Sequence, residues 1–338
     1  MMIPDRTRNR IKLDFTRNTN PIGIPDASKT ALSDIDCIEK EIDCSALTRL
    51  LAVRENTGEG NILCGNGVED LVYRLVETLH PERAIVCAPS FGAYKRALLE
   101  NKCSVQEYQL SPEDGFALTA EFADLINNDT DMVFLCSPNE PTGALITPYT
   151  LGAISEKCRE CNTILVCDES FMDIAVKGGR YSAKSLAGYH IIVLRSMSTT
   201  YSMGGLNLAY AVFAADKIAD LVRRSGRKYN VCGTAQAAGA AALSDVDYLR
   251  RSRSYISDER KYLMDNLTSM GIMVFPSQAN FLLFRCSRPI GVMLLRRGIL
   301  IHNCKDDAGL GEEYYCIYVR THAENVKLIN EIEHILHV

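Results

Sequence analysis

Small and polar residues stand at the ends of several predicted strands, where ligand sites form in open α/β sheets. The stretch Gly65-Asn66-Gly67 follows one such strand, and Val68 and Glu69 begin a predicted helix that continues to residue 79. Free backbone N–H groups at a helix start can hold a phosphate group. A plain strand-to-helix turn explains the same residues equally well, so both interpretations stay open.

Three other strand ends carry residues suited to a small ligand. Phe91 follows the strand predicted at 84–88 and would either stack on a flat ring or belong to the core. Glu140 and Asp168 follow the strands predicted at 132–136 and 163–167. Carboxyl groups placed in a pocket can act as general acid and base.

The segment 191–210 reads as a buried strand, a polar loop and a second apolar strand. The loop carries Ser196, Ser198, Thr199 and, just before the second strand, Asn207. A lysine amine at such a point would form a Schiff base with an aldehyde, whereas a threonine hydroxyl cannot form an imine.

Taken together, these segments resemble the fold-type I pyridoxal-phosphate (PLP) enzymes. The stretch 137–143 is similar to the Asn-Pro-Asn-Asn-Pro-Thr-Gly loop of aminotransferases, and 168–171 to their Asp-Glu-x-Tyr. The segment 196–210 resembles Ser-x-Ser/Thr-Lys followed by Gly-Leu-Arg-x-Gly-Tyr. The stretches 15–23 and 319–325 resemble the histidinol-phosphate aminotransferase and threonine-phosphate decarboxylase branch. The resemblance covers nearly the whole chain.

The resemblance implies a PLP cofactor and a set of positions that would hold it. Asp168 would pair with the pyridinium nitrogen and keep it protonated, so that the ring accepts electrons. The hydroxyls of Ser196 and Ser198 would bind the phosphate. The full set of implied cofactor positions is Gly65, Asn66, Gly67, Val68, Glu69, Phe91, Asp168, Ser196, Ser198 and Asn207.

The chain departs from this pattern around the reacting end of the cofactor. Thr199 stands where the family has its lysine, and Asn207 where an arginine pairs with the phosphate. Loss of that charge-assisted bond removes about 1.5–3 kcal/mol. Glu140 and Phe171 replace an asparagine and a tyrosine that hold the ring oxygen, and Cys316 falls where an arginine grips the substrate carboxylate. Implied substrate positions are Asn20, Glu140, Phe171, Cys316 and Arg320.

These departures leave three hypotheses for function. The first is an enzyme on the aminotransferase scaffold that no longer forms a lysine imine and instead binds a preformed PLP adduct, or uses Glu140, Asp168 and Thr199 for other chemistry. The second is a non-catalytic pseudoenzyme that acts as a binding or partner subunit. The third is a PLP enzyme in which Lys95, Lys177 or Lys228 supplies the amine.

Hydrophobic patterning predicts an α/β protein with seven strands in a mostly parallel sheet and a small C-terminal α/β domain. This order of elements matches the fold-type I architecture that the resemblance implies. The strands are predicted at 61–64, 84–88, 104–110, 132–136, 163–167, 190–194 and 208–214. The predicted division is an N-terminal arm at 1–42, a large domain at 43–235, and a connecting helix with the small domain at 236–338. A long charged helix is expected at 247–270.

Composition limits the classes of partner. A net charge of −5 over 338 residues argues against a nucleic-acid-binding surface, and no run is long and apolar enough to span a membrane. Thirteen cysteines and no secretion signal fit reduced thiols in the cytoplasm. Cys158 and Cys161 form a single CxxC in a helical pattern, so no metal site is predicted. The resemblance implies a homodimer that binds a small molecule.

Overall fold

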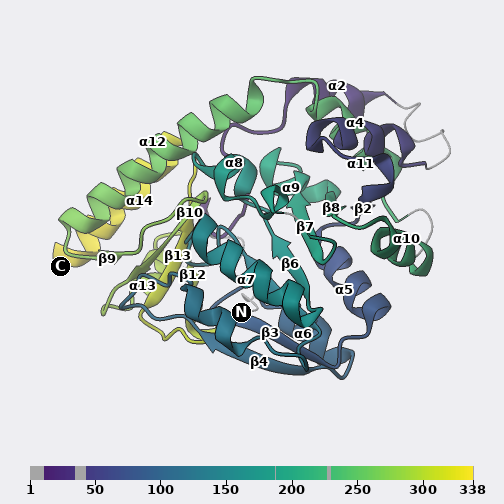
Figure 1. Cartoon of the computed structure of the whole chain (residues 1–338). Helices are drawn as coiled ribbons and strands as arrows, with labels where there is room; N and C mark the ends of the chain where they lie inside the picture. Colours follow the sequence, from purple (N-terminus) through teal and green to yellow (C-terminus); the bar gives the residue numbers. More distant parts are fainter. Residues whose placement is uncertain (1–10, 35–42, 187, 227–229, 338) are drawn as a thin grey trace.

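A seven-stranded sheet forms the centre of the larger part of the molecule (Figure 1). The computed structural model describes residues 11–34, 43–186, 188–226 and 230–337. The strand order is β2-β8-β7-β6-β5-β3-β4, and β8 is antiparallel to both its neighbours while the other pairs are parallel. The strands are β2 (Ile62–Gly65), β3 (Arg83–Ala88), β4 (Ser104–Gln109), β5 (Met132–Cys136), β6 (Ile164–Asp168), β7 (Ile191–Ser196) and β8 (Ala209–Phe213).

Helices cover both faces of this sheet, which explains why its central strands are apolar without alternation. Alternate residues of each strand enter two separate cores. One core packs against α5 (Val68–Leu79), α6 (Ala93–Glu100) and α10 (Asp216–Ser225). The other packs against α4 (Ser45–Glu55), α7 (Pro148–Cys161) and α11 (Gly233–Ala242). The helix α2 (Asp26–Ser33) lies beside α11.

Local sequence sets where these helices begin and end. In α7, Thr147 is the N-cap and its hydroxyl accepts a bond from the amide of Thr150, while Pro148 occupies the first turn. The helix ends at Asn162, which adopts a left-handed conformation with φ of 55°. These signals fix the length of α7 and hence the position of the loop that precedes it, which carries Glu140.

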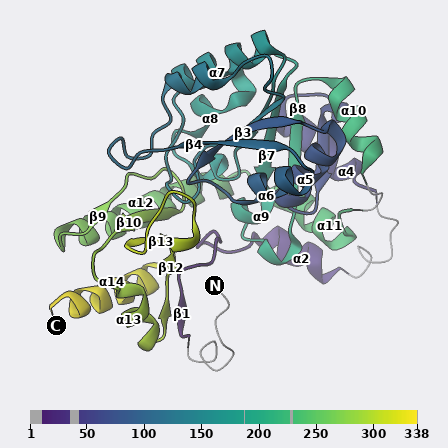
Figure 2. The same cartoon turned by 90° about the horizontal axis from the view of Figure 1, so that it is seen from below.

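A smaller α/β unit is built on a four-stranded antiparallel sheet of order β12-β13-β10-β9. Phe15, fully buried, belongs to its core, and β1 (Leu13–Asp14) pairs in parallel with β11 (Ile299–Leu300) (Figure 2). The N-terminal segment is therefore tied to the C-terminal unit. The remaining elements are α12 (Tyr248–Ser269), β9 (Met273–Val274), β10 (Phe281–Arg285), α13 (Ile290–Arg296), β12 (His302–Asn303), β13 (Tyr314–Tyr318) and α14 (His322–His337).

The predicted architecture is confirmed. Each of the seven predicted large-sheet strands is present within two residues of its expected bounds, and the long charged helix is α12. The proposed domain boundaries stay a prediction, and the residues 35–42 that adjoin the first boundary lie outside the described part.

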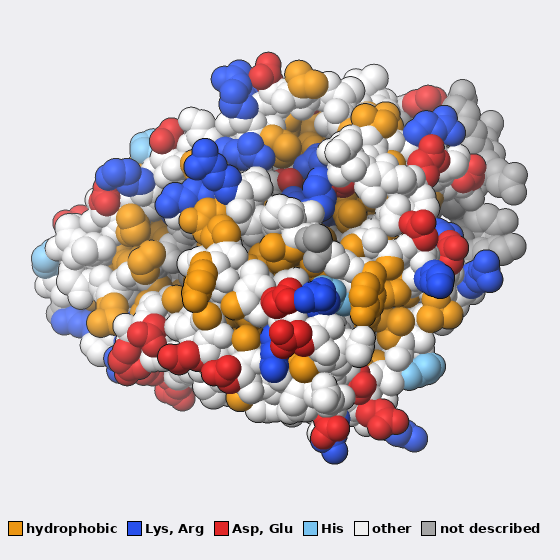
Figure 3. Space-filling model, in the orientation of Figure 1, with side chains coloured by type: hydrophobic (Ala, Val, Ile, Leu, Met, Phe, Trp, Pro, Cys, Tyr) orange, Lys and Arg blue, Asp and Glu red, His pale blue; other side chains and the backbone are white. Residues whose placement is uncertain are grey.

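On the face in Figure 3, Lys and Arg side chains gather at the upper left and Asp and Glu side chains at the lower left, and both signs occur together toward the right and the bottom. In α12 and the turn before it, Arg250 pairs with Asp247 and Arg251 with Asp245. No helix among the described residues is both long enough and apolar enough to cross a membrane.

Packing of α12 onto the small sheet predicts a large cost for truncating Leu263, which is fully buried in the small-domain core. Leu263→Ala should lower the free energy of unfolding by about 2–5 kcal/mol, because it removes buried surface and leaves a cavity. Leu221→Ala, at a position 52% exposed on α10, should change it by no more than about 0.5 kcal/mol. Urea unfolding followed by circular dichroism measures both. Equal effects would contradict this account of the core.

Candidate functional site

The carboxyl ends of neighbouring strands bring most of the predicted site residues to one edge of the large sheet. In the β5–β6–β7 register, Cys136 pairs with Asp168 and Asp168 with Leu194. The loops that follow these strands carry Glu140 and Thr199. The fold therefore places the three candidate catalytic residues on adjacent strand ends, where α/β proteins bind ligands.

Asp168 is buried at the end of β6 and both its oxygens are engaged. Oδ2 accepts a bond of 2.5 Å from the Tyr94 hydroxyl, and Oδ1 accepts bonds from the amide and hydroxyl of Ser170. Burial raises the pKa of this carboxyl above its usual value, although the hydrogen bonds oppose the shift. The Phe91 ring meets the Tyr94 ring edge-on, 5.4 Å between centroids. Tyr94 thus links Phe91 to Asp168 through a ring contact and a hydrogen bond.

Thr199 lies in a short helical turn, α9 (Met197–Thr200), directly after β7. The Ser196 hydroxyl accepts a bond from the Thr199 amide and donates one of 3.0 Å to the Thr199 hydroxyl. The Ser198 hydroxyl accepts a bond of 2.6 Å from the amide of Leu208 and donates to the carbonyl of the same residue. Both serine hydroxyls therefore form hydrogen bonds with nearby groups of the same segment.

Asn20 is buried and contacts the same turn. Its buried amide donates to the carbonyl of Thr200 at 2.9 Å and to the hydroxyl of Ser252 at 2.8 Å. Both bonds from the Asn20 amide go to protein groups. This predicted substrate residue therefore links α9 to α12.

The start of α5 is partly covered by Asn207. Gly67, the N-cap, has φ of +87°, and a Cβ there would lie 2.4 Å from Oδ1 of Asn207. The Asn207 amide donates to the carbonyl of Asn66 at 2.9 Å. Gly65 is equally confined, because a Cβ would meet Leu71 at 2.6 Å. The glycines thus permit close packing of this corner as well as access to the helix start.

The first turn of α5 is acidic and engaged with α6. Glu69, which follows Val68, forms an ion pair with Arg96. Acidic side chains in a first turn interact favourably with the helix dipole, which is the same feature that a bound phosphate would use. This turn therefore carries its own negative charge.

A cavity of about 280 Å³ opens between the loop after β5 and the small domain. Its lining includes Phe91, Glu140 and, from the small domain, Cys316 and Tyr318. The Tyr318 hydroxyl donates to Glu140, joining the two domains. Burial raises the pKa of Glu140, the hydrogen bond from Tyr318 opposes the rise, and the nearby carboxylates of Asp168 and Asp307 add to it. Neither Asp168 nor Thr199 lines this cavity.

Phe171 and Arg320 are not brought to that cavity. Phe171 is buried and packs edge-on against Phe281, 4.9 Å between ring centroids. Arg320 donates to the hydroxyl of Thr19 at 2.9 Å and faces Glu324, beside a separate cavity of about 500 Å³. Their roles in substrate binding stay a prediction.

A buried ionic network lies directly beneath the strand ends. Arg195 on β7 contacts Glu169 at 2.8 Å and Asp173 at 2.9 Å. Arg54 contacts Asp173 at 2.5 Å and donates to the Tyr201 hydroxyl at 2.6 Å. Burial alone would raise the pKa of Asp173, but the positive charges of Arg54 and Arg195 outweigh it and lower the pKa. This network includes Glu169, which directly follows Asp168, and Tyr201, which lies two residues after Thr199.

PLP fits this arrangement only in part. Phe91 and Asp168 suit the ring of such a cofactor. The hydroxyls of Ser196 and Ser198 are already bonded within the loop, Asn207 lies over the helix start, and Thr199 has no amine. The residues present therefore do not fit a PLP molecule that is bound through an imine and through an ion pair to its phosphate.

Sequence reasoning missed four residues that contact the site, Tyr94, Tyr318, His302 and Asp307. Tyr318 stands two residues after Cys316, so a strand period of two would have placed both on one face. His302 and Asp307 come from a connection whose approach to Glu140 depends on the packing of one domain against the other. No local signal marks them.

Comparison with known proteins identifies the ancestry of this fold. The sequence profile of aminotransferase class I and II matches residues 44–308. The chain belongs to the class I and II aminotransferase family. It is 33% identical to the threonine-phosphate decarboxylase of Salmonella typhimurium over 331 residues, which cover 96% of this chain and 91% of that protein.

Other relatives agree with this membership. Histidinol-phosphate aminotransferase 2 of Carboxydothermus hydrogenoformans is 30% identical, with 86% of this chain and 81% of that protein covered. The crystal structure of the histidinol-phosphate aminotransferase from Clostridium acetobutylicum superposes with a TM-score of 0.89 at 22% identity, covering 96% of this chain and 99% of that one. The structural likeness shows a shared fold.

The ionic network predicts a strong dependence of stability on Arg195. Arg195→Ala should lower the free energy of unfolding by about 3–5 kcal/mol, because it removes the cation that pairs with the buried Glu169 and leaves Asp173 with Arg54 as its partner. Arg83→Ala removes an exposed pair with Asp129 and should cost less than about 1 kcal/mol. Chemical denaturation of both variants gives the comparison. A small effect at Arg195 would show that Arg54 alone neutralises the network.

Proposed function

We propose that this chain is a divergent aminotransferase-family enzyme that does not carry out ordinary transamination and binds a small phosphorylated or amino-acid-like ligand without a covalent bond. The observation that carries the proposal is the turn around Thr199. Its hydroxyl and amide are both bonded to Ser196, and it offers no amine. Ordinary transamination needs an amine that exchanges the imine and moves the proton.

The substrate side of the pocket supports the same conclusion. Glu140 and Tyr318 form a hydrogen-bonded pair in the cavity, and a carboxylate there would repel a phenolate-like ring oxygen. Cys316 offers no positive charge to a substrate carboxylate. Glu140, whose pKa is raised, is suited to proton transfer nearer neutral pH than an ordinary glutamate.

The names of two relatives support the proposed chemical class of the ligand. These relatives are named for phosphate esters, threonine phosphate and histidinol phosphate. The start of α5 remains available in part for such an anion. Isothermal titration with threonine phosphate or histidinol phosphate should therefore give reversible, saturable binding. Absence of binding by both would favour the second hypothesis, a non-catalytic partner subunit.

Two of the three lysines considered as substitutes lie in the described part of the chain. The amine of Lys95 pairs with Glu107 at 2.6 Å, and Lys177 is exposed. Lys228 is outside the described residues. We therefore expect neither Lys95 nor Lys177 to replace the missing amine.

This expectation predicts that PLP forms no stable imine with the protein. After incubation with one equivalent of PLP, borohydride reduction and unfolding, the mass of the intact chain should be unchanged, because reduction fixes only an imine. Lys95→Arg and Lys177→Arg serve as controls. A reduced adduct that disappears in one of these variants would establish the third hypothesis.

Restoring the lysine should not restore the activity. Thr199→Lys should give no appreciable amino-acid turnover, because Glu140, Phe171, Asn207 and Cys316 still oppose cofactor and substrate. A coupled transamination assay with the wild-type chain as the matched control measures this. Substantial turnover by the single variant would show that position 199 alone separates this chain from its active relatives.

We also propose a homodimer in the cytoplasm. The dimer follows from the resemblance, and the reducing location is supported by the cysteines, which are free thiols throughout the described chain. Light scattering of the purified protein should give the mass of two chains. A single-chain mass at micromolar concentration would contradict the dimer.

A further inference from the structure

Three metal-ligating side chains converge in the small domain where β12 ends. The chain passes from His302 on β12 through a short 3-10 turn, η6 (Cys304–Asp306), to Asp307. The amide of Asp307 donates to the carbonyl of Cys304 at 2.9 Å, which closes the turn. The ligand atoms of His302, Cys304 and Asp307 all lie within 4.8 Å of one another. Only small side-chain movements are needed for these three ligand atoms to surround one ion.

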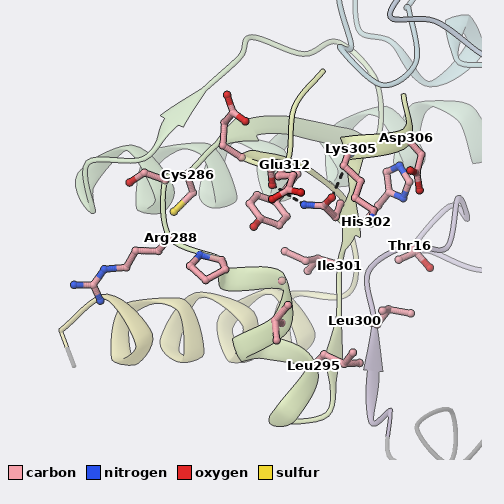
Figure 4. Close-up of a pocket in the computed structure, with 17 residues that line it drawn as sticks. Thr16, Cys286, Arg288, Leu295, Leu300, Ile301, His302, Lys305, Asp306 and Glu312 are labelled. Atoms are coloured by element: carbon pink, nitrogen blue, oxygen red, sulfur yellow. Dashed lines mark hydrogen bonds between the residues drawn. The ribbon is translucent and has the colours of Figure 1, made fainter. Parts of the chain in front are cut away.

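The cluster opens onto the cavity that holds Glu140. His302 and Asp307 line that cavity together with Cys316, which stands directly opposite His302 in the β12–β13 register. His302 also lines a second cavity of about 480 Å³ within the small domain, where it lies near Lys305 and Asp306, at the other end from Arg288 (Figure 4). A site at His302 would therefore be reachable by solvent from two sides.

Charge around the 280 Å³ cavity is unbalanced. Its described lining contains two carboxylates, Glu140 and Asp307, and neither lysine nor arginine. The nearest possible cation is His302, whose Nε2 lies 2.9 Å from Oδ2 of Asp307. Half-buried carboxylates need a compensating charge, and a second negative charge in the same pocket is costly. An ion pair between His302 and Asp307 would explain those two residues, but it leaves Glu140, whose partner is the uncharged hydroxyl of Tyr318, without a compensating cation in the described lining. It also gives no role to the buried thiol of Cys304.

We propose that His302, Cys304 and Asp307 bind one divalent transition-metal ion of the zinc class. Nitrogen, sulfur and carboxylate ligands together favour zinc over magnesium or calcium, which prefer oxygen alone. Bonds of about 2.0–2.3 Å to such an ion bring ligand atoms to about 3–4 Å from each other. Cys304 is fully buried, so the required movement falls on His302 and Asp307, whose side chains are 45% and 32% exposed.

The fourth coordination position would face the cavity beside Glu140. A positive ion there supplies the charge that Cys316 does not provide, and it would receive the anionic group of a bound ligand. This last step rests on the proposed function. The metal site itself does not, because its ligands are all in the small domain and need neither PLP nor substrate.

The test uses cobalt as a spectroscopic probe on the full chain, stripped with a chelator. Addition of Co²⁺ should produce a thiolate-to-cobalt charge-transfer band that saturates at one ion per chain and is displaced by Zn²⁺. Cys304→Ser should abolish the band. His302→Ala, at an exposed position that folding does not require, should weaken Co²⁺ binding at least about tenfold.

Cysteines outside the cluster provide matched controls. Cys158→Ser and Cys232→Ser, the first in the CxxC on α7 and the second exposed, should leave the band and the affinity unchanged. Thermal unfolding of the metal-free proteins shows that each variant is folded. No band in the wild-type chain, or a band that survives both Cys304→Ser and His302→Ala, would overturn the proposal. Because no phosphorylated ligand is added, this result is independent of the titrations that test the proposed function.

Discussion

The position of the site depends on a buried arginine. Arg195 lies one residue before Ser196 at the end of β7, and it contacts Glu169, which lies one residue after Asp168 at the end of β6. Asp173 joins Arg195 to Arg54, and thereby to α4. Charges buried this deeply are tolerated only when each is paired, so the strand ends have little freedom to shift against one another. The loops that carry the candidate residues are therefore placed by electrostatics as much as by apolar packing.

Beside these strand ends, the turn around Thr199 is polar, and its serine hydroxyls are hydrogen-bonded within the chain. Hydroxyls and amides that would meet a cofactor in the resemblance are bonded to the chain's own backbone in the turn around Thr199. Asp168 retains a partner in Tyr94, and its raised pKa reflects burial rather than an unpaired charge. Most buried polar groups around this turn therefore have protein partners without a cofactor, whereas the hydroxyl of Thr200 has none.

The small domain changes the character of the pocket's other wall. Tyr318 reaches Glu140 across the domain boundary, while His302 and Asp307 approach the same cavity from the β12 connection. This side of the cavity contains carboxylates and the thiol of Cys316, which stands where the resemblance places an arginine. A cation bound at the cluster of His302, Cys304 and Asp307 would reverse the sign of that wall and so decide which ligands the cavity accepts.

Much of the fold follows from local patterns. Continuous apolar runs located the central strands, because a sheet covered on both faces buries both sides of such strands. The helix α5 was predicted at its observed bounds from its amphipathic pattern, and in the structure it ends at His80, which is left-handed. The strand-end rule then placed Asp168 and Thr199 together. Chemical types also followed directly, since Thr199 has no amine whatever surrounds it.

Tertiary structure decided which groups those side chains meet. Sequence cannot show that Ser196 and Ser198 bond their own loop, that Asn20 braces α9, or that Phe171 packs in the core, because each contact depends on how the backbone folds back on itself. The cavity between Glu140 and the small domain arises only when residues about 160 positions apart are packed together. The sequence by itself therefore determined family membership, architecture and the residue types at the strand ends, because these depend on local pattern. The packing of the large sheet against the smaller unit decided the shape and charge of the cavity, because residues far apart in the sequence form its lining.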